Sequence, residues 1–178
     1  MQLARVLFAV GATLLISCTD ELGPPDAPGS TQETALDEAT LALAANYKAF
    51  TQVNARVDAS QIGSYDINIY VTGDVDAYES IHPETSATVA PLAIGTLIVR
   101  EVLDSSGGVS KLTMMAKGPA GYDPSLGDWW FAEADPQGQP VVDNGVLEAG
   151  QLVDSCHSCH IPRQTEDYLF GVPAADMN

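Results

Sequence analysis

Two cysteines and a histidine near the end of the chain have a spacing suited to cofactor chemistry. Cys156, Cys159 and His160 form the pattern C-x-x-C-H, which is typical of c-type haem attachment. Two intervening residues let both sulfurs reach the two vinyl groups of one porphyrin, and the next residue presents an imidazole to the iron. The motif predicts one covalent haem c, bound by Cys156 and Cys159, with His160 as an axial ligand. His157, at a variable position of the motif, is expected to play no part.

Two other uses of paired cysteines fit the sequence less well. A thioredoxin-like redox pair lies early in a domain beside a βαβ pattern, whereas this pair comes late in a chain with antiparallel strand patterns. A structural zinc site takes a second pair of ligands from a distant segment. Outside the motif the chain offers His82 and Cys18, and Cys18 has a different expected role.

The first eighteen residues resemble the export signal of a bacterial lipoprotein. Residues 1–17 contain one basic residue, Arg5, and then an apolar run that is too short to span a bilayer. The run ends in Leu-Ile-Ser before Cys18, like a lipobox, so we expect cleavage there and a diacylglycerol on the Cys18 sulfur. An ordinary signal peptide or an uncleaved anchor, with an incidental cysteine, is the alternative.

Lipidation of Cys18 predicts a protein that faces the periplasm from a membrane. Thr19, in place of an aspartate, favours the outer membrane in a Gram-negative host. Residues 18–30 are rich in proline, glycine and acid, which predicts a flexible tether. The chain has 24 acidic against 7 basic residues and a net charge of -17, so it lacks the basic patch that nucleic-acid binding requires.

Residues 31–178 are expected to form one α+β domain with a mainly antiparallel sheet. Apolar residues at three- and four-residue steps, Leu36, Ala39, Leu43, Tyr47 and Phe50, predict an amphipathic helix over about residues 31–50. Runs rich in β-branched and aromatic residues, separated by Gly- and Pro-containing turns, predict consecutive antiparallel strands. The C-terminal segment with the motif is expected to form a loop and a short helix on the sheet. The strand runs are Ile67–Val71, Thr96–Val102, Leu112–Ala116 and Trp129–Ala132, and the turns are residues 104–108 and 135–138.

Beyond the motif, roughly residues 45–170 resemble the cytochrome P-460 family, which includes the haem proteins called cytochrome c′-β. The order and spacing of several short stretches carry this resemblance. It implies a mainly antiparallel β fold, a homodimer, and a haem held near the C-terminus. Family members either oxidise hydroxylamine or bind small gases such as nitric oxide. Besides the motif, the matching stretches are residues 47–54, 67–71, 95–101, 114–117, 121–124, 127–130 and 167–170.

Arg100 stands where the family's enzymes have a lysine that is cross-linked to the porphyrin. A guanidinium stays protonated and is no nucleophile, so we expect no cross-link at Arg100, and Lys117 is the candidate substitute. A family carboxylate that assists proton transfer would fall near Thr113 or Met114, and neither side chain is an acid. For Arg100 three roles remain open: pairing with a haem propionate, donating to a diatomic ligand, or a surface ion pair with Glu101 or its neighbours.

The sixth iron position decides between two classes of function. The family resemblance favours an empty position and a five-coordinate haem that binds nitric oxide or a related small nitrogen species. A protein ligand there would make a six-coordinate electron carrier, working with an unidentified redox partner. Hydroxylamine oxidation is the third possibility, opposed by Arg100 and by the missing acid. The candidate protein ligands are His82, Met114, Met115 and Met177.

Overall fold

The structure is a computed structural model that describes residues 31–55, 58–59, 66–85, 87–143, 146–147, 149–150 and 154–178. The expected signal peptide, Cys18 and the tether lie outside the described residues. Among the residues that are described, no helix has both the length and the apolar character needed to cross a bilayer.

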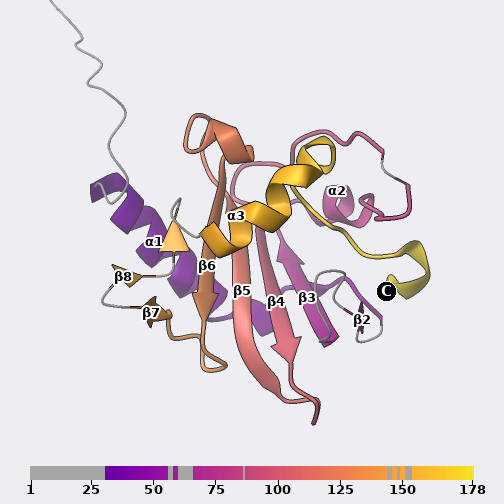
Figure 1. The fold of residues 1–178 in the computed structure, drawn as a ribbon, viewed down its shortest axis with the longest axis horizontal. Helices are drawn as coiled ribbons and strands as arrows, with labels where there is room; N and C mark the ends of the chain where they lie inside the picture. The colour runs from indigo at the N-terminus through magenta and orange to yellow at the C-terminus, as the bar shows by residue number, and fades with distance from the viewer. Residues whose placement is uncertain are drawn as a thin grey trace, which may run out of the picture.

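One antiparallel sheet forms the centre of the molecule, and helical segments cover both of its faces (Figure 1). The strand order is β1-β3-β4-β5-β6-β9, and β2 also pairs with β3. The α-helices are α1 (Thr31–Ala44), α2 (Val75–Glu79) and α3 (Asp154–His160), and the 3-10 helices are η1 (Tyr47–Ala49), η2 (Pro124–Leu126), η3 (Ile161–Glu166) and η4 (Ala174–Asp176). The strands are β1 (Thr51–Gln52), β2 (Asp58–Ala59), β3 (Asp66–Thr72), β4 (Leu97–Leu103), β5 (Val109–Lys117), β6 (Trp129–Ala134), β7 (Val142–Asp143), β8 (Val146–Leu147) and β9 (Ala149–Gly150).

The four predicted strands are confirmed as β3 to β6, and each pairs with the next in antiparallel register. The predicted turn between β4 and β5 is confirmed as well. In that turn the Asp104 carboxylate accepts the backbone N–H groups of Ser106 at 2.8 Å and of Gly108 at 3.0 Å, as short acidic side chains do in tight turns. The protein therefore belongs to the α+β class with an antiparallel sheet.

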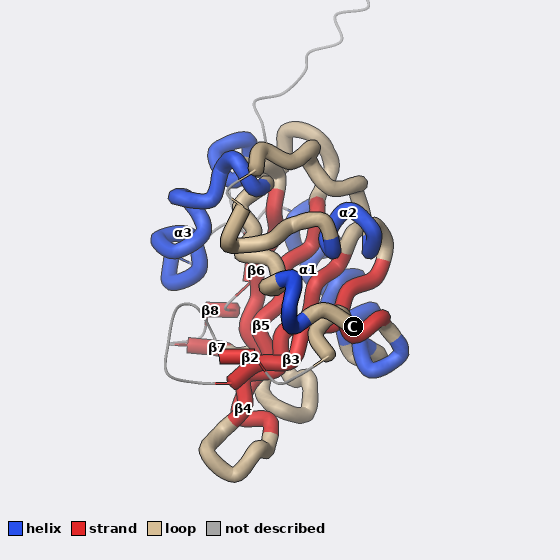
Figure 2. The backbone as a smooth tube through the Cα atoms, turned by 90° about the vertical axis from the view of Figure 1, so that its right-hand side faces the viewer, coloured by secondary structure: helices blue, strands red, loops and turns tan. Residues whose placement is uncertain are grey.

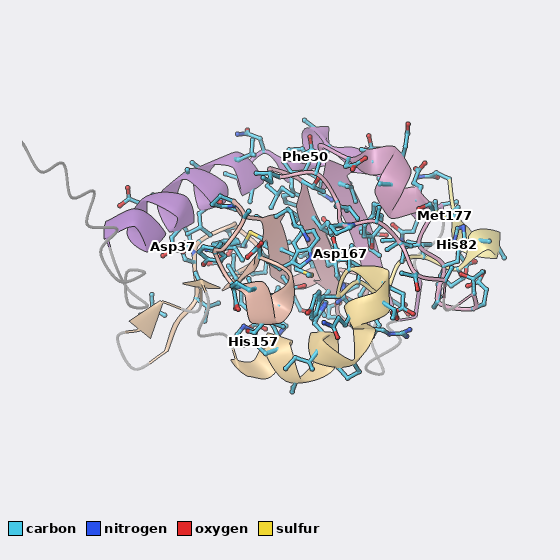
Figure 3. All side chains as sticks on the ribbon, turned by 90° about the horizontal axis from the view of Figure 1, so that it is seen from above. Asp37, Phe50, His82, His157, Asp167 and Met177 are labelled. Atoms are coloured by element: carbon cyan, nitrogen blue, oxygen red, sulfur yellow. The ribbon has the colours of Figure 1, made fainter. Side chains whose placement is uncertain are left out.

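Alternate residues of the strands face opposite sides of the sheet. We call the side that packs against the cysteine motif the motif face, and the side that packs against α1 the α1 face; Figure 3 shows the sheet between these two layers. Trp129 and Trp130 illustrate the alternation, because both are completely buried and they belong to the core clusters of opposite faces. The two faces thus have separate cores.

Helix α1 is present, but it ends at Ala44 and buries a different stripe from the predicted one. Thr40 and Ala44 are buried, whereas Leu43 is 48% exposed. The Trp130 indole N–H donates to the Asp37 carboxylate at 2.5 Å, which turns the line through residues 37, 40 and 44 toward the sheet. Ala39 and Leu43 of the predicted stripe are exposed, because they lie about 100° around the helix from that line, whereas Tyr47, beyond the end of α1, is buried as predicted.

Candidate functional site

The cysteine motif lies on α3, which crosses the motif face beside the strands (Figures 1 and 2). Cys156, Cys159 and His160 are separated by three and four residues, so they share one side of the helix. Pro162 lies in the first turn of η3, and because proline cannot donate a helical hydrogen bond, α3 gives way to a 3-10 helix after His160. Both sulfurs and the imidazole consequently face the same space.

That space is a pocket of about 290 Å³ between α3 and the sheet. Its volume is at the lower end of the range of ordinary ligand pockets, roughly 300–1,000 Å³. Apolar and charged side chains share the lining. The lining residues are both cysteines and His160 from the motif, Ile98, Arg100 and Val102 from β4, Lys111, Thr113, Met114 and Met115 from β5, and Phe131 and Glu133 from β6.

An apolar row of the pocket floor lies under the motif. Strand register pairs Ile98 with Met115 and Met115 with Phe131. The Phe131 ring meets the His160 ring edge-on at 5.3 Å between centroids, and it meets His157 at the same distance. His157 therefore packs against the floor, and its buried Nε2 has no hydrogen-bond partner among the described residues.

A polar row runs beside the apolar one. Arg100 is paired with Thr113, and Thr113 is paired with Glu133 on the next strand. Lys111 Nζ lies 2.8 Å from Glu133 Oε1, so an ion pair borders this row. The pocket consequently offers an arginine, a hydroxyl and a carboxylate along one line, which can donate and accept hydrogen bonds.

His160 is held in the tautomer that binds a metal ion through Nε2. Its Nδ1 lies 2.5 Å from the backbone carbonyl oxygen of Tyr168, and because a carbonyl can only accept, Nδ1 carries the proton. Burial lowers the pKa of His160 to about 4, although the hydrogen bond to Tyr168 opposes this shift, and the charges of Arg100 and His157 lower it further. At neutral pH the imidazole is thus uncharged, as metal ligation requires.

The sequence suggested Arg100, Thr113, Met114 and Lys117 as residues near the open side of the haem. Three of these four border the pocket, but their side chains lie differently. Arg100 and Thr113 are on the motif face. Met114 borders the pocket as well, yet its side chain belongs to the core of the α1 face. Lys117 is not among the lining residues, and its Nζ is 2.7 Å from Asp167 in a buried ion pair.

The four candidate ligands for the sixth iron position lie in different parts of the molecule. Met115 projects from the motif face and lines the pocket, in contrast to Met114. His82 and Met177 lie at the end of the molecule away from His157 (Figure 3). Nδ1 of His82 is 3.0 Å from the carbonyl oxygen of Val172. Of the four candidates, Met115 is therefore the one whose side chain reaches the pocket.

The ion pair with Glu101, one of the roles considered for Arg100, does not form, because these neighbours face opposite sides of the sheet. Glu101 is 1% exposed on the α1 face. Its carboxylate accepts from the Tyr47 hydroxyl at 2.6 Å and from Asn68 Nδ2 at 2.9 Å, and it pairs with Lys48. Arg100 accordingly borders the pocket, and its pairing with Glu101 is wrong.

Sequence reasoning missed Lys111 and Glu133. Both lie on the motif face, and Glu133 is directly opposite Thr113. Thr113 and Met114 are not acids, but a carboxylate from the next strand therefore lies beside Thr113 in the pocket. The alternation of side chains along a strand predicts that Lys111 is on the same face as Thr113. The position of Glu133 beside Thr113, in contrast, requires the register of β5 against β6.

The pocket residues fit a covalent haem. The cysteines share a helix side with a neutral histidine whose Nε2 is available to iron, and the facing sheet supplies an apolar row for a porphyrin ring and cations for its carboxylates. Among the described residues, no group of three or more His, Cys, Asp and Glu side chains is placed to hold a bare metal ion. No model of a known protein family matches the chain, and no curated protein matches it either.

Proposed function

We propose that this protein is a monohaem c-type cytochrome of the cytochrome P-460 type, five-coordinate at iron, that binds nitric oxide or a related small nitrogen species. The observation that carries the proposal is the shared pocket: Cys156, Cys159 and His160 face a row formed by Arg100, Thr113 and Glu133. A motif on an exposed surface, or one packed against an apolar core alone, would not support ligand binding in the same way.

Each residue of the site has a defined task in this function. A bound haem supplies an iron that takes up small ligands and changes oxidation state. Cys156 and Cys159 fix its position through thioether bonds, and His160 holds an uncharged nitrogen toward the pocket because its other nitrogen donates to Tyr168. Arg100 and Thr113 donate hydrogen bonds to polar groups that enter the pocket.

The test begins with the mature protein produced in a host that attaches haem c. Porphyrin should remain bound after denaturation, and the ferrous absorption spectrum should change when carbon monoxide or nitric oxide is added. Protein without covalent porphyrin overturns the whole proposal. A low-spin spectrum that neither gas alters overturns ligand binding and leaves a six-coordinate electron carrier, in which case Met115→Ala should restore the response to gas.

Glu133 favours a second candidate function, the oxidation of hydroxylamine. Its carboxylate borders the pocket beside Thr113, and a carboxylate can accept the protons that this oxidation releases. The test is turnover of hydroxylamine with an artificial electron acceptor in the wild type and in Glu133→Gln. A rate that Glu133→Gln lowers by at least tenfold supports this function, and no rate in the wild type excludes it.

We further propose that the protein is anchored through Cys18 to a membrane and faces the periplasm. The support is the lipobox-like sequence before Cys18 and the acidic, proline-rich residues after it. Wild-type protein should fractionate with membranes, preferably the outer membrane, whereas Cys18→Ala should release it or leave it unprocessed. Cleaved Cys18→Ala protein that associates with membranes as strongly as the wild type would exclude the lipid anchor.

A further inference from the structure

A left-handed turn follows the cysteine motif and faces His160. Asp167 and Tyr168 have φ angles of +51° and +63°, a region that residues other than glycine rarely adopt. In this conformation the Tyr168 N–H donates to the Arg163 carbonyl at 2.7 Å, and the Tyr168 carbonyl accepts from His160. The orientation of the imidazole therefore depends on two consecutive residues in an unfavourable backbone conformation.

A buried ion pair holds this turn to the sheet. Lys117 Nζ lies 2.7 Å and 2.9 Å from the two carboxylate oxygens of Asp167, and the side chains are only 6% and 4% exposed. Oδ2 of Asp167 also accepts the Leu92 N–H at 2.8 Å. Figure 3 shows Asp167 between the sheet and the C-terminal segment. A carboxylate buried this deeply requires such partners.

The backbone of Asp167 is fixed as well as its side chain. The Trp129 indole N–H donates to the Asp167 carbonyl at 2.8 Å. Trp129 is opposite Lys117 in the β5–β6 register, and the Lys117 ammonium lies 4.7 Å from the centre of the Trp129 ring. Lys117 of β5 and Trp129 of β6 thus bind both the carboxylate and the carbonyl of Asp167. The next residue, Tyr168, supplies the carbonyl that accepts from His160.

From this arrangement we propose that Lys117 and Asp167 are positioning residues for His160. They hold the Tyr168 carbonyl against Nδ1, which keeps Nε2 unprotonated and directed to the pocket and makes the imidazole a stronger donor to iron. The statement about iron rests on the proposed function, whereas the statement about the imidazole tautomer holds for the chain with or without haem. Neither Lys117 nor Asp167 lines the pocket.

The first test compares Asp167→Asn and Lys117→Met with Lys48→Met, which removes the lysine of the ion pair on the α1 face. In the haem-loaded protein, loosening the hydrogen bond to Nδ1 should lower the iron–histidine stretching frequency measured by resonance Raman spectroscopy and make the reduction potential more positive. Lys48→Met should leave both quantities at the wild-type value. Lys117→Arg, which keeps the positive charge, should give values close to those of the wild type. Wild-type values in folded Asp167→Asn and Lys117→Met overturn the proposal.

The second test uses the full chain without haem and reads the His160 tautomer from nitrogen NMR shifts above pH 7. The wild type should carry its proton on Nδ1, and Asp167→Asn should give a mixture of both tautomers. A wild-type proton on Nε2 overturns the proposal without any variant, which covers the case in which the variants fail to fold. Failure of haem attachment would overturn the proposed function and leave this measurement intact, so the two failures are distinguishable.

Discussion

The two faces of the sheet are made from alternate residues of the same strands, but they differ in what they leave open. On the α1 face, Glu101 is enclosed by Tyr47, Asn68 and Lys48, and its carboxylate is fully used. On the motif face, the neighbouring residue Arg100 borders a pocket of about 290 Å³. One face is closed by its own side chains, whereas the other keeps space for a ligand.

This difference assigns separate tasks to residues that are adjacent in sequence. In the pattern from Gly95 to Glu101, an arginine that lines the pocket is followed directly by a glutamate buried among its partners. Period-two geometry puts them on opposite faces, so a substitution of either one should alter a different property. If the comparison is correct, variants of the motif face change haem and gas binding, and variants of the α1 face change stability.

The largest effect is expected from the double variant Cys156→Ala/Cys159→Ala on the motif face. Without sulfurs no thioether can form, so the denatured protein should retain no porphyrin, as measured by in-gel haem staining and absorbance. Ser158→Ala is the matched control, because Ser158 is exposed in the same helix, and it should retain haem. Porphyrin that survives denaturation of the double variant would contradict the assigned attachment site.

On the α1 face, Glu101→Gln should destabilise the fold and leave the haem attached. The donors Tyr47 and Asn68 lose a charged acceptor in a buried position, which corresponds to about 1–3 kcal/mol of unfolding free energy. Urea unfolding at pH 7 measures this loss. Glu38→Gln, an exposed change on α1, is the control and should have almost no effect.

The Glu101 contribution should also depend on pH. Burial alone would raise its pKa, but hydrogen bonds from Lys48, Tyr47 and Asn68 outweigh burial and hold the pKa below the ordinary value of 4.5. Because the folded pKa is the lower one, the stabilisation is complete above pH 4.5 and is lost as the pH falls through the folded pKa. The difference in stability between wild type and Glu101→Gln should therefore shrink below pH 4.5, and a constant difference would contradict this account.

Arg100→Ala should have the opposite profile, with haem retained, stability nearly unchanged and gas binding altered. Loss of a charged donor to a bound ligand corresponds to roughly 1.5 kcal/mol, or about tenfold in affinity. Gas titration of the ferrous protein measures the change, with Arg100→Lys as the variant that keeps the charge. An unchanged affinity would show that Arg100 does not donate to the ligand.

Much of the fold followed from the sequence because its signals are local. The runs that became β3 to β6 have β-branched and aromatic residues bounded by turn residues, and Asp104 has a side chain suited to the turn that it forms. The grouping of Cys156, Cys159 and His160 follows equally from their spacing. These features depend on residues within a few positions of one another.

The features of the fold and the site that were not predicted depend on contacts between distant segments. Glu133 entered the pocket through the register of β6 against β5, which no local pattern specifies. Lys117 forms an ion pair with Asp167, which is fifty residues further along the chain. The positive φ angles of Asp167 and Tyr168 could not be predicted either, since neither residue is a glycine and the surrounding contacts impose that conformation.

The smallest predicted effect tests whether the two faces are independent. Asp37→Ala removes the acceptor of the Trp130 indole N–H on the α1 face, which should lower the unfolding free energy by about 0.5–1.5 kcal/mol and the Tm by roughly 2–4 °C for each kcal/mol. Glu38→Ala, at the exposed neighbouring position, is the matched control. Trp130 lies beside Phe131, whose ring packs against His160 from the other face. A change in gas affinity in Asp37→Ala would therefore mean that strain passes through β6, and unchanged affinity would mean that the α1 face supports the pocket only by keeping the sheet folded.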